Sequence, residues 1–128
     1  MILTEEQKQH IVKDLMDFAD NQYANNEKKE RQKLGQFFTP PELVIRMIEK
    51  FHDLDDDVLD PCVGSGNLLV GCIIAGADPK RCYGIELDEK QAEICRNRLE
   101  NYGVPRENII TGSCLDDSVM NILKEKVK

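Results

Sequence analysis

The chain carries the segment VLDPCVGSGNLL at residues 58–69. Its first residues are typical of a short buried strand, which ends at Asp60 and passes through a glycine loop into an apolar helix. Gly64 and Gly66 allow backbone N–H groups to approach a ligand closely, and the helix that follows directs its positive end at an anionic group. Ser65 adds a hydroxyl. The segment favours a nucleotide-type pocket, although glycines between a strand and a helix also serve the turn alone.

The composition describes one small acidic domain. The chain has 128 residues, of which 41% are hydrophobic and 32% charged, and its formal net charge is −7. Because a protein grips a phosphate backbone through Lys and Arg, a nucleic acid partner would have to be held by basic surface from another chain. Five separated cysteines without a C-x-x-C pair, and two histidines, predict reduced thiols and no metal site.

No targeting or membrane signal is visible in the sequence. The N-terminus MILTEE has neither the basic region nor the apolar core of a signal peptide. No apolar run approaches the length that spans a bilayer. We therefore expect a soluble, cytoplasmic protein without membrane contact.

The pattern divides the chain into an N-terminal part, residues 1–33, and a compact domain, residues 34–128. Residues 4–7, TEEQ, form a capping-box pattern that predicts a helix to about residue 22. The polar stretch 20–33 predicts a linker or a solvated extension of that helix. A second helix opens the domain, with Thr39 as its expected N-cap and Pro40 as its first residue.

Short strands and helices alternate beyond residue 51. We expect strands at 58–60, 82–86 and 108–111, and helices at 67–75, 89–102 and 116–126. Alternating βαβα units imply a parallel sheet with right-handed crossovers. The fold class is therefore α/β.

An acidic residue at the end of the second predicted strand sharpens the pocket hypothesis. Glu86 lies 22 residues beyond Gly64, a spacing at which an acid meets the hydroxyls of a ribose. It could instead cap the following helix, but Asp88 is the better cap. Leu87 would then lie against the base.

The segment Phe37-Phe38-Thr39-Pro40 precedes the second helix. Its aromatic pair could be a hydrophobic staple and nothing more. The exposed N–H groups and hydroxyl of the helix start could also face a carboxylate.

Three ordered motifs, GQFFTP at 35–40, DPCVGSG at 60–66 and GIELD at 84–88, resemble those of N6-adenine DNA methyltransferases, especially the modification subunits of restriction systems. The similarity covers about residues 34–115. It implies a truncated Rossmann-like class I methyltransferase fold with three layers, a short parallel sheet of three strands, flanking helices and an extra N-terminal helix.

The resemblance also implies that the cofactor is S-adenosyl-L-methionine. In the family, the positions of Thr39 and the glycine loop hold the methionine end, Asp60 the amino group, Glu86 the ribose and Leu87 the adenine. The resemblance assigns cofactor contacts to Phe37, Phe38, Thr39, Pro40, Asp60, Pro61, Gly64, Ser65, Gly66, Glu86, Leu87 and Ser113.

The sequence departs from the family pattern in two places. Ser113 occupies a position after the third predicted strand where the family usually has an acid that reads adenine. The family's catalytic motif, Asn/Asp-Pro-Pro-aromatic, is absent, since the one Pro-Pro is Pro40-Pro41 and Glu42 follows it. We therefore expect no catalytic residue here and no methylation by this chain alone.

Three interpretations remain open: a cofactor-binding half that is active with a partner, a degenerate non-catalytic methyltransferase that acts as a binding or regulatory module, and an excised domain of a longer enzyme. In each, strand 58–60 is an apolar sheet edge of the kind that proteins cover. We expect the N-terminal helix, self-association or a partner chain to cover it.

Overall fold

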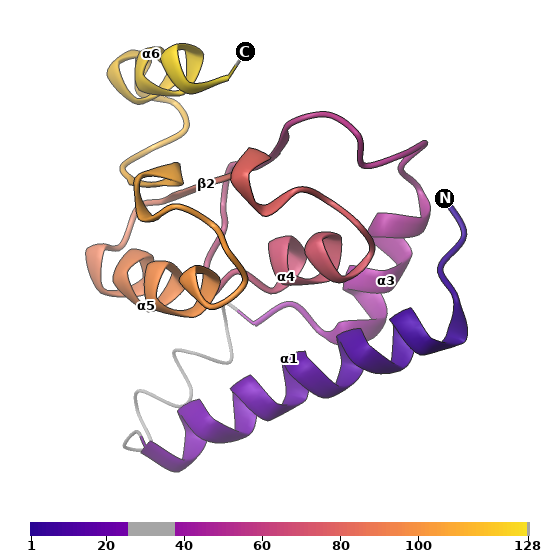
Figure 1. Cartoon of the computed structure of the whole chain (residues 1–128). Helices are drawn as coiled ribbons and strands as arrows, with labels where there is room; N and C mark the ends of the chain where they lie inside the picture. The colour runs from indigo at the N-terminus through magenta and orange to yellow at the C-terminus, as the bar shows by residue number, and fades with distance from the viewer. Residues whose placement is uncertain (26–37, 128) are drawn as a thin grey trace.

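The computed structural model describes residues 1–25 and 38–127, and within them five α-helices and three strands (Figure 1). The helices are α1 (Glu5–Asn25), α3 (Pro41–Glu49), α4 (Asn67–Ile74), α5 (Glu89–Glu100) and α6 (Asp117–Lys126). The strands are β1 (Val58–Asp60), β2 (Cys82–Glu86) and β3 (Ile109–Thr111), with short 3₁₀ turns at Pro79–Arg81 and Arg106–Asn108.

The three strands form one parallel sheet in the order β1-β2-β3. Val58 lies opposite Cys82 across the first pair, and Gly84 lies opposite Ile109 across the second. The predicted strands and their parallel pairing are confirmed. Among the described residues β1 pairs with β2 alone, so it is an edge strand as expected.

Side chains alternate between the two faces of the sheet and build a core on each. Cys82 and Ile109 belong to the larger core, which includes residues of α1, α3, α4 and α5. Tyr83 and Ile85 face the other way and pack with Val119 and Leu123 of α6. Figure 1 accordingly shows α5 and α6 on opposite sides of β2. The expected three-layer α/β arrangement is confirmed.

Helix α1 begins with the predicted capping box. The Thr4 amide donates to Gln7 Oε1 at 2.9 Å, and the Gln7 amide donates to Thr4 Oγ1 at 3.1 Å. Fully buried Ile11 and Leu15 lie on the face that packs against α3 and α4. This helix therefore packs on the layer formed by α3 and α4. The polar stretch 20–33 is helical as far as Asn25, and its remainder falls outside the described residues.

The predicted start of α3 is wrong by one residue. Its N-cap is Pro40, with φ −61° and ψ 147°, and the first helical residue is Pro41. A residue before proline is forced out of the helical region, so Pro40-Pro41 postpones the helix. The Thr39 hydroxyl is consequently not a capping group, because no side chain caps this helix.

Close contact between α3 and α4 depends on Gly71. A Cβ at this position would lie 2.5 Å from Val44 Cγ1 and 2.9 Å from Ile48 Cδ1. The two helices thus meet backbone against side chain at this position. No helix within the described parts of the chain is both long and apolar enough to cross a bilayer.

Candidate functional site

A cavity of about 550 Å³ opens at the carboxyl ends of the three strands. Ligands of open α/β sheets bind at this edge, and the volume falls within the usual range for small-molecule sites. Four segments contribute its walls: the approach to α3, the loop after β1, the end of β2 and the loop after β3. The lining residues are Phe38, Thr39, Pro40, Leu43, Pro61, Cys62, Gly64, Ile85, Glu86, Leu87, Gly112, Ser113 and Cys114.

The glycine loop between β1 and α4 has two residues in the left-handed region. Gly64 has φ 55° and lines the cavity, whereas Gly66 has φ 95° and is the N-cap of α4. A Cβ on Gly66 would lie 3.2 Å from both Cys95 Sγ and Leu99 Cδ2. Gly66 therefore serves the packing of the loop on α5, and Gly64 is the glycine that a ligand would meet.

Among the described residues that line the cavity, Glu86 is the one acidic side chain. It ends β2 and is only 8% exposed. Burial raises the pKa of its carboxyl group, while the nearby backbone N–H groups of Asp88 and Gly64 oppose that rise. Asp88 caps α5 by accepting from the amides of Lys90 and Gln91 at 2.9 and 3.1 Å. The sequence predicted Asp88 rather than Glu86 as the cap of this helix, and the structure confirms it.

Apolar and hydroxyl groups flank this carboxylate. Leu87 is 74% exposed, so its side chain presents an uncovered apolar surface at the cavity. Ser113 lies in the loop after β3, where its Oγ accepts from the Leu115 amide at 3.1 Å. That bond leaves the hydroxyl hydrogen of Ser113 available as a donor.

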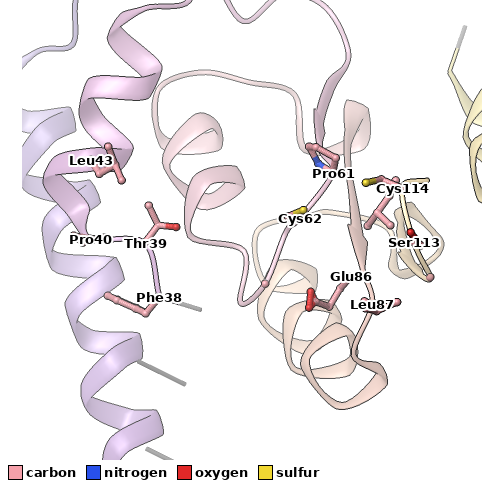
Figure 2. Close-up of a pocket in the computed structure, with 13 residues that line it drawn as sticks. Phe38, Thr39, Pro40, Leu43, Pro61, Cys62, Glu86, Leu87, Ser113 and Cys114 are labelled. Carbon is pink, nitrogen blue, oxygen red and sulfur yellow. The ribbon is translucent and has the colours of Figure 1, made fainter. Parts of the chain in front are cut away.

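The opposite wall comes from the segment that leads into α3. Figure 2 shows Phe38 and Thr39 facing Glu86 and Leu87 across the open space. The main-chain carbonyl of Thr39 accepts from Asn67 Nδ2 at 2.8 Å, which ties this wall to the first residue of α4. Phe37, the remaining predicted residue of the segment, falls outside the described residues.

Three predicted contact residues stand behind the wall rather than in it. Asp60 accepts from the Cys62 amide at 3.1 Å, and burial raises the pKa of its carboxyl group. Ser65 is 5% exposed, and its Oγ has no partner among the described residues. Gly66 packs on α5. Their direct contact with a ligand stays a prediction.

Five lining residues were not singled out from the sequence: Leu43, Cys62, Ile85, Gly112 and Cys114. A usable signal existed for Gly112 and Cys114, because they follow the third strand at the ligand-binding edge. Leu43 lies in the first turn of α3, and its role depends on where that helix starts.

The chemistry of the wall narrows the ligand class. The lining residues include no Lys, Arg or His, so the cavity as described offers no cation for a phosphate. The described residues also contain no group of three His, Cys, Asp or Glu side chains able to hold a metal ion. The cavity suits a ligand with hydroxyls, a flat apolar ring and positive rather than negative charge.

Comparisons with known proteins identify the family to which the chain is similar. A family model described as N-6 DNA Methylase matches residues 7–126. The type II methyltransferase M.VspI of Vibrio sp. (strain 343) is 34% identical over 82 residues, which are 62% of this chain and 20% of that protein. The methylase subunit of the type I restriction enzyme MpnII of Mycoplasma pneumoniae is 33% identical over 111 residues, 80% of this chain and 20% of that subunit. The chain thus spans about a fifth of the length of these relatives.

Proposed function

The chain belongs to the N-6 DNA methylase family, and we propose that it binds S-adenosyl-L-methionine in the cavity at the carboxyl ends of its strands. The observation that carries the proposal is the position of Glu86. A buried carboxylate ends the second strand beside an exposed leucine, in a wall without cations. This set complements the nucleoside part of the cofactor, which as a whole has a ribose, an adenine, two positive groups and one carboxylate but no phosphate.

Each part of the cofactor has a proposed counterpart in the walls. The Glu86 carboxylate accepts hydrogen bonds from the ribose hydroxyls, and Leu87 covers one face of the adenine. Ser113 donates its free hydroxyl hydrogen near the adenine edge, in place of the acid that is usual in the family. Thr39 and Gly64 hold the methionine end, with the negative charge of Asp60 behind the loop favouring the amino group.

The bound cofactor supplies an activated methyl group, and we propose that this chain holds it without transferring it alone. The sequence contains no Asn/Asp-Pro-Pro-aromatic loop to receive a flipped adenine, and Pro40-Pro41 opens α3 instead. The net charge of −7 gives little attraction for DNA. DNA would therefore be reached through a partner that brings basic surface and the catalytic loop.

The outer edge of β1 is the proposed contact for a partner or for a second copy. Leu59 of this strand is 43% exposed, and it lies on the sheet face that α6 covers only over β2 and β3. An unpaired, partly apolar strand edge offers backbone groups to an added strand. A concentration-independent monomer in sedimentation velocity, with or without candidate partners, would exclude this contact.

Calorimetric titration with S-adenosyl-L-methionine tests the proposed binding directly. We expect saturable binding at one site and its loss in Glu86→Ala. Glu107→Ala is a matched control, because Glu107 is an exposed glutamate in the turn before β3 and does not line the cavity. The proposal would be overturned by a folded wild-type chain that gives no binding heat with S-adenosyl-L-methionine and none with S-adenosyl-L-homocysteine.

The alternative function, a non-catalytic binding or regulatory module, is favoured by the missing catalytic motif. The two functions differ in one assay. Methyl transfer to DNA that appears on adding a partner chain supports the split enzyme. Cofactor binding that never leads to transfer with any methyltransferase partner supports the module.

A further inference from the structure

A buried polar chain runs from α5 to the wall of the cavity. Arg98 is 6% exposed, and its Nη1 donates to Asn67 Oδ1 at 2.6 Å and to the Ser65 carbonyl at 3.1 Å. Asn67 is 2% exposed and passes the connection on, since its Nδ2 donates to the Thr39 carbonyl at 2.8 Å. One guanidinium thus connects the glycine loop with the Thr39 wall.

The orientation of the Asn67 amide follows from these partners. Its oxygen must face Arg98, which has donors only, and its nitrogen must face the Thr39 carbonyl, which only accepts. A flipped amide would set donor against donor and acceptor against acceptor. These contacts therefore fix one orientation of the Asn67 amide, while Arg98 Nη2 has no hydrogen-bond partner among the described residues.

Helix α1 closes the far side of Arg98. The guanidinium carbon lies 3.8 Å from the centroid of the Phe18 ring, a favourable cation–π contact. Nearby, Tyr102 donates to Asp14 Oδ2 at 2.8 Å, which joins α1 to the turn after α5. Desolvation lowers the pKa of Arg98 to about 10, so the side chain still carries its charge at neutral pH.

Thr39 depends on this network for its position. It precedes α3 and belongs to neither a helix nor a strand. Within the described part of the chain, its one hydrogen bond is the one from Asn67. The wall that faces Glu86 is thus held by a side chain rather than by a ladder of backbone hydrogen bonds.

We propose that Asn67 and Arg98 are positioning residues that hold the Thr39 wall against the glycine loop and thereby set the affinity for the methionine end of the cofactor. The inference rests on the proposed function. Neither side chain lines the cavity, so both act through Thr39 and Ser65. The nucleoside end, at Glu86 and Leu87 on the other wall, does not meet the Asn67–Thr39 contact; it is linked to Arg98 through the glycine loop, where the Gly64 backbone N–H bonds to the Glu86 carboxylate.

Asn67→Asp tests the proposal with a near-isosteric change. The aspartate keeps an acceptor for Arg98 but replaces the donor to Thr39 by an oxygen that repels its carbonyl. We expect the Kd for S-adenosyl-L-methionine to rise about tenfold or more, the usual result of breaking one buried hydrogen bond. The Kd for 5′-methylthioadenosine, which has the same nucleoside and no amino-acid end, should change less than twofold.

Two further variants serve as a matched control and as a second test. Asn101→Asp makes the same chemical change on an exposed residue just after α5, so it should alter neither affinity. Asn67→Ala removes the donor to Thr39 without adding charge. If the aspartate disturbs folding, this variant should show the same selective loss. Far-ultraviolet circular dichroism at the titration temperature verifies that each variant is folded.

The possible results distinguish the positioning role of Asn67 and Arg98 from the proposed binding of S-adenosyl-L-methionine. Selective loss of affinity for the complete cofactor supports the positioning role. Equal losses for the two ligands, or none for either, in a folded Asn67 variant overturn it and leave the proposed function standing. A folded wild-type chain that binds neither ligand overturns both.

Discussion

The contact between α3 and α4 predicts that Gly71→Ala destabilises the wild-type chain. The same substitution should stabilise a chain in which Val44 has been shortened. In Gly71→Ala the new methyl group would lie 2.5 Å from Val44 Cγ1, whereas ordinary carbon contacts are about 3.5–4.0 Å. Val44 is fully buried and β-branched, so it has no free rotamer in its helix. The helices must separate, at a cost of about 1–3 kcal/mol.

The helix propensity of alanine partly offsets this cost. Alanine is favoured over glycine inside a helix by about 1 kcal/mol. We therefore expect Gly71→Ala to lower the free energy of unfolding by up to about 2 kcal/mol. Ile48 Cδ1, 2.9 Å from the same position, is the end of a flexible side chain and can turn away.

The second background decides whether the clash is the cause. In Val44→Ala the nearest obstructing atom is gone, so adding Gly71→Ala should stabilise the chain by up to about 1 kcal/mol. Urea unfolding followed by circular dichroism gives all four free energies, and the coupling should be about 1–3 kcal/mol. Equal effects of Gly71→Ala in both backgrounds would refute the reasoning.

Three other predictions concern the cavity. Glu86→Gln should bind S-adenosyl-L-methionine at least tenfold more weakly. Burial raises the pKa of Glu86 in the folded chain. The protonated carboxyl group therefore stabilises the fold fully below the ordinary pKa of a glutamate. This contribution is lost as pH rises through the raised pKa of the folded chain. Tm of the variant should thus gain on wild type from pH 4 to pH 7, and a relative fall would contradict the buried charge. Exposed Cys62 should react with iodoacetamide before buried Cys72 and Cys95; burial raises the pKa of all three thiols, to about 12 in the two buried ones. Bound S-adenosyl-L-methionine should slow the labelling of Cys62, which mass spectrometry measures. An unchanged labelling rate at saturating cofactor would place the ligand elsewhere. Gly66→Ala should cost about 1–3 kcal/mol more in urea than Gly76→Ala, because both have positive φ but only Gly66 is crowded; equal losses would count against that crowding.

Local patterns in the sequence predicted much of this fold because each had a local physical cause. The capping box at Thr4 and Gln7 forms as expected, and Asp88 rather than Glu86 caps α5. The strand at 82–86 has the predicted bounds and places Glu86 at the ligand-binding edge. The start of α3 was missed because two consecutive prolines postpone the helix, whereas one proline would have opened it.

Contacts between distant residues could not be predicted in this way. Arg98 reaches Asn67 and Ser65 across more than thirty residues of chain, and no periodicity connects them. A buried arginine on a helix face looks like an ordinary charged residue until its partners are known. Asp60, at the end of its strand, is not among the residues that line the cavity, and its contact with a ligand stays a prediction.

The most direct test of the cofactor site is a titration of the ¹⁵N-labelled chain with S-adenosyl-L-homocysteine, followed by amide chemical shifts. We expect saturable shifts centred on Gly64, Leu87 and Ser113, at the ends of all three strands. Amides of α6 beyond its first turn should move little, because that helix covers the opposite face of the sheet. Saturation with no shift at the three strand ends, or with the largest shifts on α6, would contradict the cofactor site proposed here.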